Sequence, residues 1–247
     1  MHRFFVAPET IQGQVCELAG DHARQISRVL RLRPGERVEL LDDTGWAFVT
    51  ELEHIAPASV RGRIINRYQP TTEPRCALAL YQALPKHQKF DWVLQKGTEL
   101  GVSTFVPLIT SRSNVRANAR SDRTKALRWD RIVTEASEQS GRTRRPRVLP
   151  VMTFEQACST LPDDALGIMP YMDATKSLSE VLRTDAHDTP VRVRLLIGPE
   201  GGFTAQEAAI AENSGHALVS LGPRTLRSET AAIAAATIIL HVLDQIG

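Results

Sequence analysis

The sequence predicts an α/β protein in which a parallel sheet, covered by helices on both faces, follows a small β-rich module. Three observations predict this fold class. The first 70 residues contain short strand-like runs around a hairpin turn, and a linker rich in proline and threonine follows them. From the linker onward, apolar runs of strand length alternate with helical patterns. Strands joined by helical crossovers pair in parallel, which gives the expected sheet.

Residues 1–70 are predicted to form the β-rich module. Two apolar stretches flank the turn Asp42–Gly45, a pattern typical of a hairpin. A helical pattern between Asp21 and Leu32 ends at Pro34-Gly35, because proline and glycine interrupt helices. The strands expected in this module are Arg37–Leu41, Trp46–Thr50 and Val60–Ile65.

After the linker Gln69–Pro74, residues 71–247 are predicted to form one α/β domain. Thr153 with Gln156, and Thr204 with Glu207, have capping-box spacing and mark two helix starts. The expected strands are 77–84, 104–109, 147–151, 165–171, 191–197 and 217–221, and the expected helices are about 87–100, 122–140, 153–160, 177–183, 204–214 and 228–246.

Composition and spacing exclude several classes of protein. The three cysteines lie far apart, which is typical of buried thiols in a reducing compartment. The N-terminus has no apolar stretch of signal-peptide length, and the longest apolar run, Ala231–Leu240, is too short to span a bilayer. None of the seven histidines has metal-ligand spacing. We therefore expect a cytoplasmic protein with no membrane span and no metal site.

The charge is distributed unevenly along the chain, although the net charge is only +2. Residues 111–150 carry eleven Lys and Arg against four acidic residues, whereas residues 151–247 carry six against twelve. Arginine supplies 25 of the 30 basic residues, and its planar fork suits phosphate groups. Two interpretations stay open at this point: a polyanionic partner, or a solvated charged face.

A glycine-rich loop, Gly198–Gly202, follows the strand expected at 191–197. Ligands of open α/β sheets bind beyond the carboxyl ends of the strands, and glycine lets the backbone approach a ligand closely. The loop lacks the Lys and Ser/Thr of a phosphate-binding P-loop and is not GxGxxG. Triphosphate binding is therefore disfavoured, an adenosine-type ligand stays open, and a purely structural turn is the alternative.

A second loop, Leu221–Thr230, follows the next expected strand in the same way. Gly222-Pro223 predicts a tight turn, and Ser228 or Thr230 is a candidate cap for the apolar helix that follows. Two glycine loops at neighbouring strand ends favour a single cleft over two unrelated turns. The charged residues that this loop brings to the start of the helix are Arg224, Arg227 and Glu229.

The loops Ile197–Gly202 and Leu221–Ala231 closely resemble the paired cofactor loops of the SPOUT methyltransferases. More narrowly they resemble those of the RsmE family, which methylates N3 of a uridine in bacterial small-subunit ribosomal RNA. The resemblance runs along the whole chain, with small departures at Gly97 and Thr225, where the family pattern has Ala and Ile. The other blocks that carry it are Arg3-Phe4-Phe5, His22–Arg33 with Pro34-Gly35-Glu36, Lys96–Val102 and Glu135–Arg142.

This resemblance implies a PUA-like RNA-binding β-barrel over residues 1–70 and a SPOUT α/β domain with a deep trefoil knot over 71–247, an exception to the rule that chains avoid knots. It also implies a homodimer and the cofactor S-adenosylmethionine. The residues expected to surround the cofactor are Met169, Pro170, Tyr171, Ile197, Gly198, Pro199, Glu200, Gly201, Gly202, Leu221, Gly222, Thr225 and Leu226.

Methylation of uridine N3 requires loss of the imide proton, so a carboxylate that takes the proton or an arginine that stabilises the resulting charge is expected. Arg227 is the candidate for charge stabilisation or uracil binding, and Glu229 is the candidate base. Two alternatives stay open: Glu200 as the base, and a purely dipole-complementing role for Glu229 at a helix start. The sulfonium is electrophilic by itself, so no metal is expected.

The expected partner is small-subunit ribosomal RNA, in the assembled 30S particle. Alternatives are a SPOUT methyltransferase that acts on tRNA, and a non-catalytic RNA-binding protein of ribosome assembly. Basic residues supply the phosphate contacts of RNA-binding proteins. The arginines expected to contact RNA are Arg24, Arg28, Arg31, Arg112, Arg116, Arg142, Arg144 and Arg145.

Overall fold

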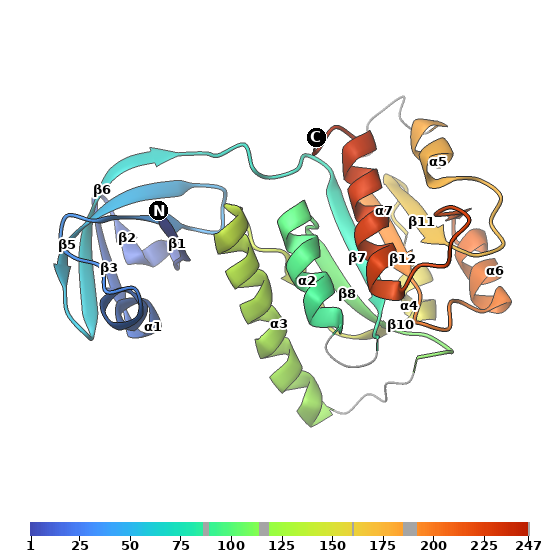
Figure 1. Ribbon diagram of the computed structural model, residues 1–247, viewed down its shortest axis with the longest axis horizontal. Coiled ribbons are helices and arrows are strands. Elements are labelled where there is room, and N and C mark those ends of the chain that lie inside the picture. Colours follow the sequence, from blue (N-terminus) through green and yellow to red (C-terminus); the bar gives the residue numbers. More distant parts are fainter. Residues whose placement is uncertain (86–88, 114–118, 160, 185–191, 247) are drawn as a thin grey trace. The chain divides into compact units, whose positions relative to one another are not determined.

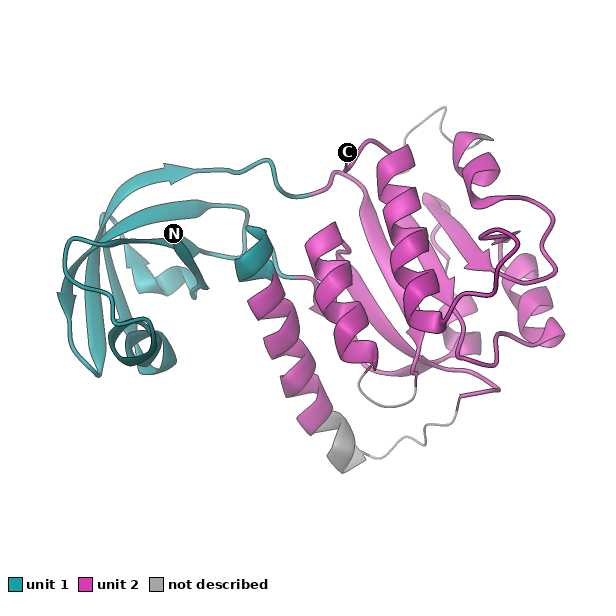
Figure 2. Cartoon of the chain, in the orientation of Figure 1, with its two compact units in different colours: residues 1–73, 137–145 teal, residues 74–136, 146–247 magenta. Residues whose placement is uncertain are grey.

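The protein is described by a computed structural model and divides into two compact units (Figure 2). The first contains residues 1–73 and 137–145, and the second contains residues 74–136 and 146–247. The sequence gives no sign that 137–145 return to the first unit. The residues described are 1–85, 89–113, 119–159, 161–184 and 192–246, without the side chains of 119–123 and 184.

The first unit is built on a curled six-stranded sheet of order β1-β4-β5-β6-β3-β2. Only β1 and β4 pair in parallel, and the other neighbours are antiparallel. The predicted hairpin is confirmed, because β4 and β5 pair across a turn in which the Asp42 carboxylate accepts the Thr44 and Trp46 N–H groups. The strands are β1 (His2–Phe5), β2 (Ile11–Gln12), β3 (Val15–Ala19), β4 (Arg37–Leu41), β5 (Ala47–Ile55) and β6 (Ser59–Tyr68).

The helical segment of the first unit differs from the prediction. An α-helix, α1 (Gly20–Arg24), runs into a π-helical turn, η2 (Gln25–Val29), and the helix does not extend to Leu32. Arg31 has a φ of 54°, and the Leu32 N–H donates to the Ile26 carbonyl, six positions earlier, so the chain reverses at Arg31 and the helical segment ends. The ending returns Leu32 to the apolar core, where it packs with Ile26.

The second unit contains the predicted parallel sheet, in the order β10-β8-β7-β12-β11-β13, with the short β9 pairing with β8. The strand expected at 147–151 is reduced to two residues, and another two-residue strand follows it. The strands are β7 (Ala77–Ala83), β8 (Thr104–Ile109), β9 (Arg147–Val148), β10 (Met152–Thr153), β11 (Ala165–Pro170), β12 (Arg192–Ile197) and β13 (His216–Val219).

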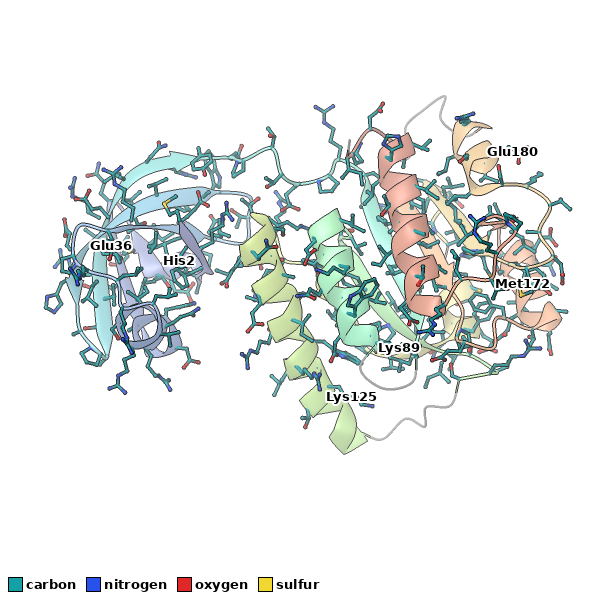
Figure 3. The ribbon with its side chains drawn as sticks, in the orientation of Figure 1. His2, Glu36, Lys89, Lys125, Met172 and Glu180 are labelled. Atoms are coloured by element: carbon teal, nitrogen blue, oxygen red, sulfur yellow. The ribbon has the colours of Figure 1, made fainter. Side chains whose placement is uncertain are left out.

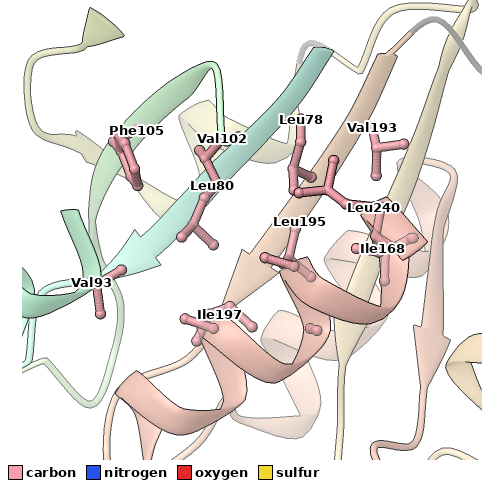
Figure 4. Close-up of a cluster of buried hydrophobic side chains, with 14 of the residues drawn as sticks. Leu78, Leu80, Val93, Val102, Phe105, Ile168, Val193, Leu195, Ile197 and Leu240 are labelled. Atoms are coloured by element: carbon pink, nitrogen blue, oxygen red, sulfur yellow. The ribbon is translucent and has the colours of Figure 1, made fainter. Parts of the chain in front are cut away.

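Helices cover both faces of this sheet, as predicted (Figure 1). On one face α2 and α7 pack side by side over Leu78, Leu80 and Leu195 (Figure 4). Leu196 points to the other face, where α4 and α6 pack, so the central strand β12 is apolar on both sides. The helices are α2 (Lys89–Leu100), α3 (Ala119–Ser140), α4 (Phe154–Cys158), α5 (Leu178–Thr184), α6 (Ala205–Asn213) and α7 (Ser228–Val242).

Local capping signals correctly predict two helix starts and fail at a third. Thr153 and Thr204 form complete capping boxes at the starts of α4 and α6. At α7, however, the N-cap residue is Arg227 and no side chain caps the helix, so the expected cap at Ser228 or Thr230 is wrong. The Ser228 hydroxyl is buried and bonds elsewhere, as described below. Over the described ranges, no helix is both long and apolar enough to cross a membrane.

Candidate functional site

The carboxyl ends of β12, β11 and β13 lie next to each other in the sheet and bring the three predicted cofactor segments together. Met169 and Pro170 pair in register with Leu218 and Val219, and the Tyr171 N–H donates to the Val219 carbonyl at 3.0 Å. The first glycine loop leaves β12 at the same edge. The side chain of Met169 is buried, so the segment Met169–Tyr171 reaches this edge mainly with backbone groups.

The first loop, Gly198–Gly202, is held by side chains from the end of β8. The Gly202 N–H closes a turn on the Pro199 carbonyl at 2.9 Å, and Arg112 donates to the Gly201 carbonyl at 2.6 Å. The buried Glu207 accepts the Ser111 N–H at 2.8 Å while it completes the capping box of α6. Arg112 is among the arginines expected to contact RNA, and in the structure it contacts the glycine loop.

One glycine of each loop faces open space. Gly202 has a φ of 68° and Gly222 a φ of 102°, and a Cβ at either position meets no atom within 4 Å. These positions need glycine for the left-handed backbone and not for close packing. The space beside them leaves room for a ligand against the backbone. This arrangement fits a cofactor such as S-adenosylmethionine, which carries many hydrogen-bonding groups.

A buried hydroxyl ties the second loop to the first. Ser228 donates to the Gly198 carbonyl at 2.5 Å and accepts from the Gln82 side-chain amide at 2.8 Å. The other amide atom, Gln82 Oε1, is buried and has no partner among the described residues. Sequence reasoning missed both roles, although a glutamine inside the apolar run 77–84 is a signal of a buried polar contact.

Lys89 lies at the start of α2 (Figure 3). It connects the carboxylates of both loops. Its ammonium group lies 3.1 Å from Glu229 Oε1 and 3.9 Å from Glu200 Oε1. Sequence reasoning did not place it in the site, because the contacts join residues more than one hundred positions apart. The two candidate bases therefore share one cation.

The pKa of Glu229 is lower than that of an ordinary carboxyl group. Burial raises it, but the Glu229 backbone N–H, the Lys89 ammonium and Arg227 together outweigh burial. A carboxylate so stabilised is ionised at neutral pH and is a weak proton acceptor. The geometry thus suits Glu229 as a charge partner of Lys89 better than as a base. Arg227 itself is exposed at the start of α7.

The remaining RNA-binding candidates lie in the first unit or outside the described residues, as Arg116 does. Arg142 is 4% exposed and forms an ion pair with Glu73 at 2.9 Å, so the expected phosphate contact at Arg142 is wrong for the folded state. Arg144 donates to the Thr44 carbonyl, and Arg145 pairs with Asp43 at 3.0 Å. Arg24, Arg28 and Arg31 are exposed. Arg31, with its positive φ, lies after the end of the helical segment.

Comparisons with known proteins agree with this site. A family model described as an RNA methyltransferase domain matches residues 72–240. Ribosomal RNA small subunit methyltransferase E of Bacillus subtilis is 31% identical over 98% of this chain and 96% of its own, and the Synechocystis protein of the same name is 32% identical over 98% and 78%. The crystal structure of that enzyme from Neisseria gonorrhoeae bound to S-adenosyl methionine has a TM-score of 0.89 and 30% identity, and covers 98% of each chain.

The Bacillus and Neisseria matches cover 98% of this chain and so extend over both units. The chain belongs to the RNA methyltransferase family, within the group of ribosomal RNA small subunit methyltransferase E.

Proposed function

We propose that the protein is an S-adenosylmethionine-dependent methyltransferase that methylates N3 of a specific uridine in small-subunit (16S) ribosomal RNA. The observation that carries this proposal is the bond between Ser228 and the Gly198 carbonyl, which joins two glycine loops into one ligand-binding edge. The relatives named above support the substrate class. The alternatives, a tRNA methyltransferase or a non-catalytic assembly protein, have no specific observation in their favour.

The cofactor is proposed to bind against the backbone of both loops. When bound, S-adenosylmethionine supplies an electrophilic methyl group. A Cβ at Gly202 or Gly222 would meet no atom within 4 Å, so the cofactor has room to lie against the backbone at both positions. The residues proposed to hold it are Met169, Pro170, Tyr171, Ile197, Gly198, Pro199, Glu200, Gly201, Gly202, Leu221, Gly222, Thr225 and Leu226.

The chain's own chemical task is to make the uracil imide nitrogen nucleophilic. Loss of the N3 proton leaves negative charge shared with O2 and O4, so nearby cations lower the free energy of that form. Arg227 and Lys89 are the cations proposed for this role. Glu229 then orients Lys89, and the more exposed Glu200 is the candidate acceptor of the proton. Holding the uracil in line with the methyl group lowers the barrier through orientation.

The proposal also covers the form of the substrate, the cellular location and the oligomeric state. The substrate is proposed to be the ribosomal RNA within the assembled 30S particle, and the protein is proposed to act in the cytoplasm as a homodimer. Support for RNA contact comes from exposed arginines of the first unit, namely Arg24, Arg28, Arg31 and Arg144.

The test is incubation of the protein with labelled S-adenosylmethionine and one of three RNAs: undermodified 30S subunits, naked 16S RNA or tRNA. Mapping of the labelled nucleoside should give 3-methyluridine in the subunits. Absence of label in every RNA overturns the enzyme assignment, and label in tRNA alone favours the alternative. Light scattering of the purified protein tests the dimer.

The role of Arg227 has its own test. Arg227→Ala should keep cofactor affinity and lower turnover by about a hundredfold, the usual effect of removing one donor to a developing charge. Calorimetry of cofactor binding and single-turnover methylation separate the two quantities. Lost cofactor binding with unchanged turnover per bound site contradicts the assigned role.

A further inference from the structure

A cavity in the first unit stands apart from the methyltransferase site. It has a volume of about 640 Å³ and is lined by residues in and around β2, by the end of β6 and by the β4–β5 hairpin. A volume of this size lies in the range of small-ligand pockets, about 300–1,000 Å³. Its apolar wall contains Ile11, Phe48 and Ile64, and its polar groups include Gln14, Asn66 and Arg67.

Arg67 is fixed in position by aromatic side chains. Its guanidinium carbon lies 3.7 Å from the centre of the Trp46 ring and 5.5 Å from that of Phe48. No ion pair joins Arg67 to a carboxylate of the described residues, whereas Arg63 on the same strand pairs with Glu51 and Glu53. A stacked guanidinium keeps its N–H edge available, and this edge matches a phosphate group.

Asp42 makes the interior of the cavity suited to a hydrogen-bond donor and not to a phosphate. It is 8% exposed and lines the cavity. Its Oδ1 accepts the N–H groups of Thr44 and Trp46, whereas Oδ2 accepts only the Thr44 hydroxyl. Oδ2 therefore has capacity for one more donor. A carboxylate repels a phosphate but accepts the exocyclic amino group of a base, so the phosphate belongs at the rim with Arg67 and the base inside.

We propose that this cavity binds one unpaired nucleotide of the RNA substrate, with an amino-bearing base inside and its phosphate on Arg67. An apolar wall, two side-chain amides and a stacked arginine form the combination by which proteins recognise single-stranded RNA. Cytosine, adenine or guanine is favoured over uracil, because uracil has no amino group to offer Asp42. The inference rests on the proposed function, since it takes the substrate to be RNA.

Binding is tested directly with the full-length protein and single-stranded RNA hexamers of C, A and U. The indole N–H resonance of Trp46, assigned by its absence in Trp46→Phe, reports on the cavity. It should shift with the C or A hexamer and shift less with the U hexamer. No shift with any hexamer, or equal affinity for all three, overturns the proposal.

Arg67→Ala and the matched control Arg63→Ala provide the second arm. Arg67→Ala should weaken C-hexamer binding about tenfold, the effect of losing a charged hydrogen bond. It should also reduce the slope of log affinity against log salt by about 0.7, the value for one phosphate contact of a single strand. Arg63→Ala should change neither quantity. Equal effects of the two variants overturn the assignment of Arg67.

Gln14→Ala keeps the inference testable if loss of Arg67 disturbs Trp46. It should weaken C-hexamer binding about fivefold without changing the salt slope, because a neutral hydrogen bond is lost. Unchanged affinity counts against the cavity. Cofactor binding and 3-methyluridine formation by the wild-type protein are measured in parallel. If the wild-type protein shows neither cofactor binding nor 3-methyluridine formation, the proposed function is overturned. If the cavity variants bind the hexamers as tightly as the wild type, only this inference is overturned.

Discussion

Ser228 and Gly198 lie thirty residues apart and are joined by a hydrogen bond of 2.5 Å from the serine hydroxyl to the glycine carbonyl. The same hydroxyl accepts a hydrogen bond from the Gln82 amide, so the ends of β7 and β12 meet the start of α7 at one buried oxygen. A residue at the start of α7 therefore sets the spacing between the two loops.

Ser228→Ala should destabilise the protein by about 1–3 kcal/mol, because it removes the donor to the part-buried Gly198 carbonyl and one of the two acceptors of the buried Gln82 amide, which still donates to the Ala83 carbonyl. Cofactor affinity should fall with it. Urea unfolding and calorimetry measure the two effects. Thr230→Ala, at an exposed position of the same helix, is the control and should stay within about 0.5 kcal/mol of wild type. Wild-type cofactor affinity in Ser228→Ala would show that the bond does not position the loops.

Lys89→Met should lower turnover more than it changes cofactor affinity, since it removes the cation that contacts both Glu200 and Glu229. The pKa of Glu229, lowered in the folded protein, contributes stability above the ordinary carboxyl pKa of 4.5, and this stability is lost as pH falls through the lowered value. In Lys89→Met, the stability that Glu229 contributes should no longer fall with pH in this way.

Lys96→Met is the matched control for this prediction, because Lys96 lies on the same helix and pairs only with its neighbour Glu99. It should leave turnover and the acid profile unchanged. Unfolding midpoints between pH 3 and 7, with single-turnover rates, separate the two lysines. If both variants have the same turnover and the same unfolding midpoints, Lys89 has no role in the site beyond that of a surface lysine.

Arg142→Ala should unfold the first unit more easily, because Glu73 loses the guanidinium and keeps the Thr143 and Arg144 N–H groups, and loss of a charged hydrogen bond costs about 1.5–3 kcal/mol. Arg28→Ala, at an exposed site, should leave stability within about 0.5 kcal/mol and weaken RNA binding in a salt-dependent way. Denaturant midpoints and RNA titrations measure both. A stable Arg142→Ala protein with lost RNA affinity would restore Arg142 as an RNA contact.

His216 predicts a second acid dependence. Burial, helped by the neighbouring Arg194, lowers its pKa from 6.5 to about 4, although a bond to the Ala211 carbonyl opposes the shift. Because the folded pKa is lower than the unfolded one, stability is complete above pH 6.5 and falls by about 3 kcal/mol as the pH drops to 4. His216→Gln should flatten this decline, and the exposed His241→Gln should not. Thermal unfolding across this range decides.

The sequence predicts features whose cause is local. Thr153 and Thr204 correctly predict the starts of their helices, because a capping box needs only two residues that are three positions apart. The turn after Asp42 is equally self-contained, since its carboxylate binds the next few N–H groups. The two glycine loops are also visible, because positive φ at Gly202 and Gly222 requires the residue type itself.

Features that depend on distant partners escape sequence reasoning. Lys89 joins the site through Glu229, 140 positions away, and through Glu200. Ser228 looks like a helix cap, yet its hydroxyl turns to Gly198. Arg142 lies in a basic run and looks like a phosphate ligand, but Glu73 neutralises it in the interior of the first unit. Side-chain charge and spacing are the same in both interpretations, and burial decides between them.

The return of residues 137–145 to the first unit has a consequence for biosynthesis. The Glu138 carboxylate accepts the Phe5 N–H, and Arg142 pairs with Glu73, so these contacts wait until the ribosome has made twice the length of the β-rich module. The N-terminal unit is thus completed in the middle of translation and not at its start. A fragment that ends at the linker lacks a structural part of its own unit, and tolerance of truncation there should be poor.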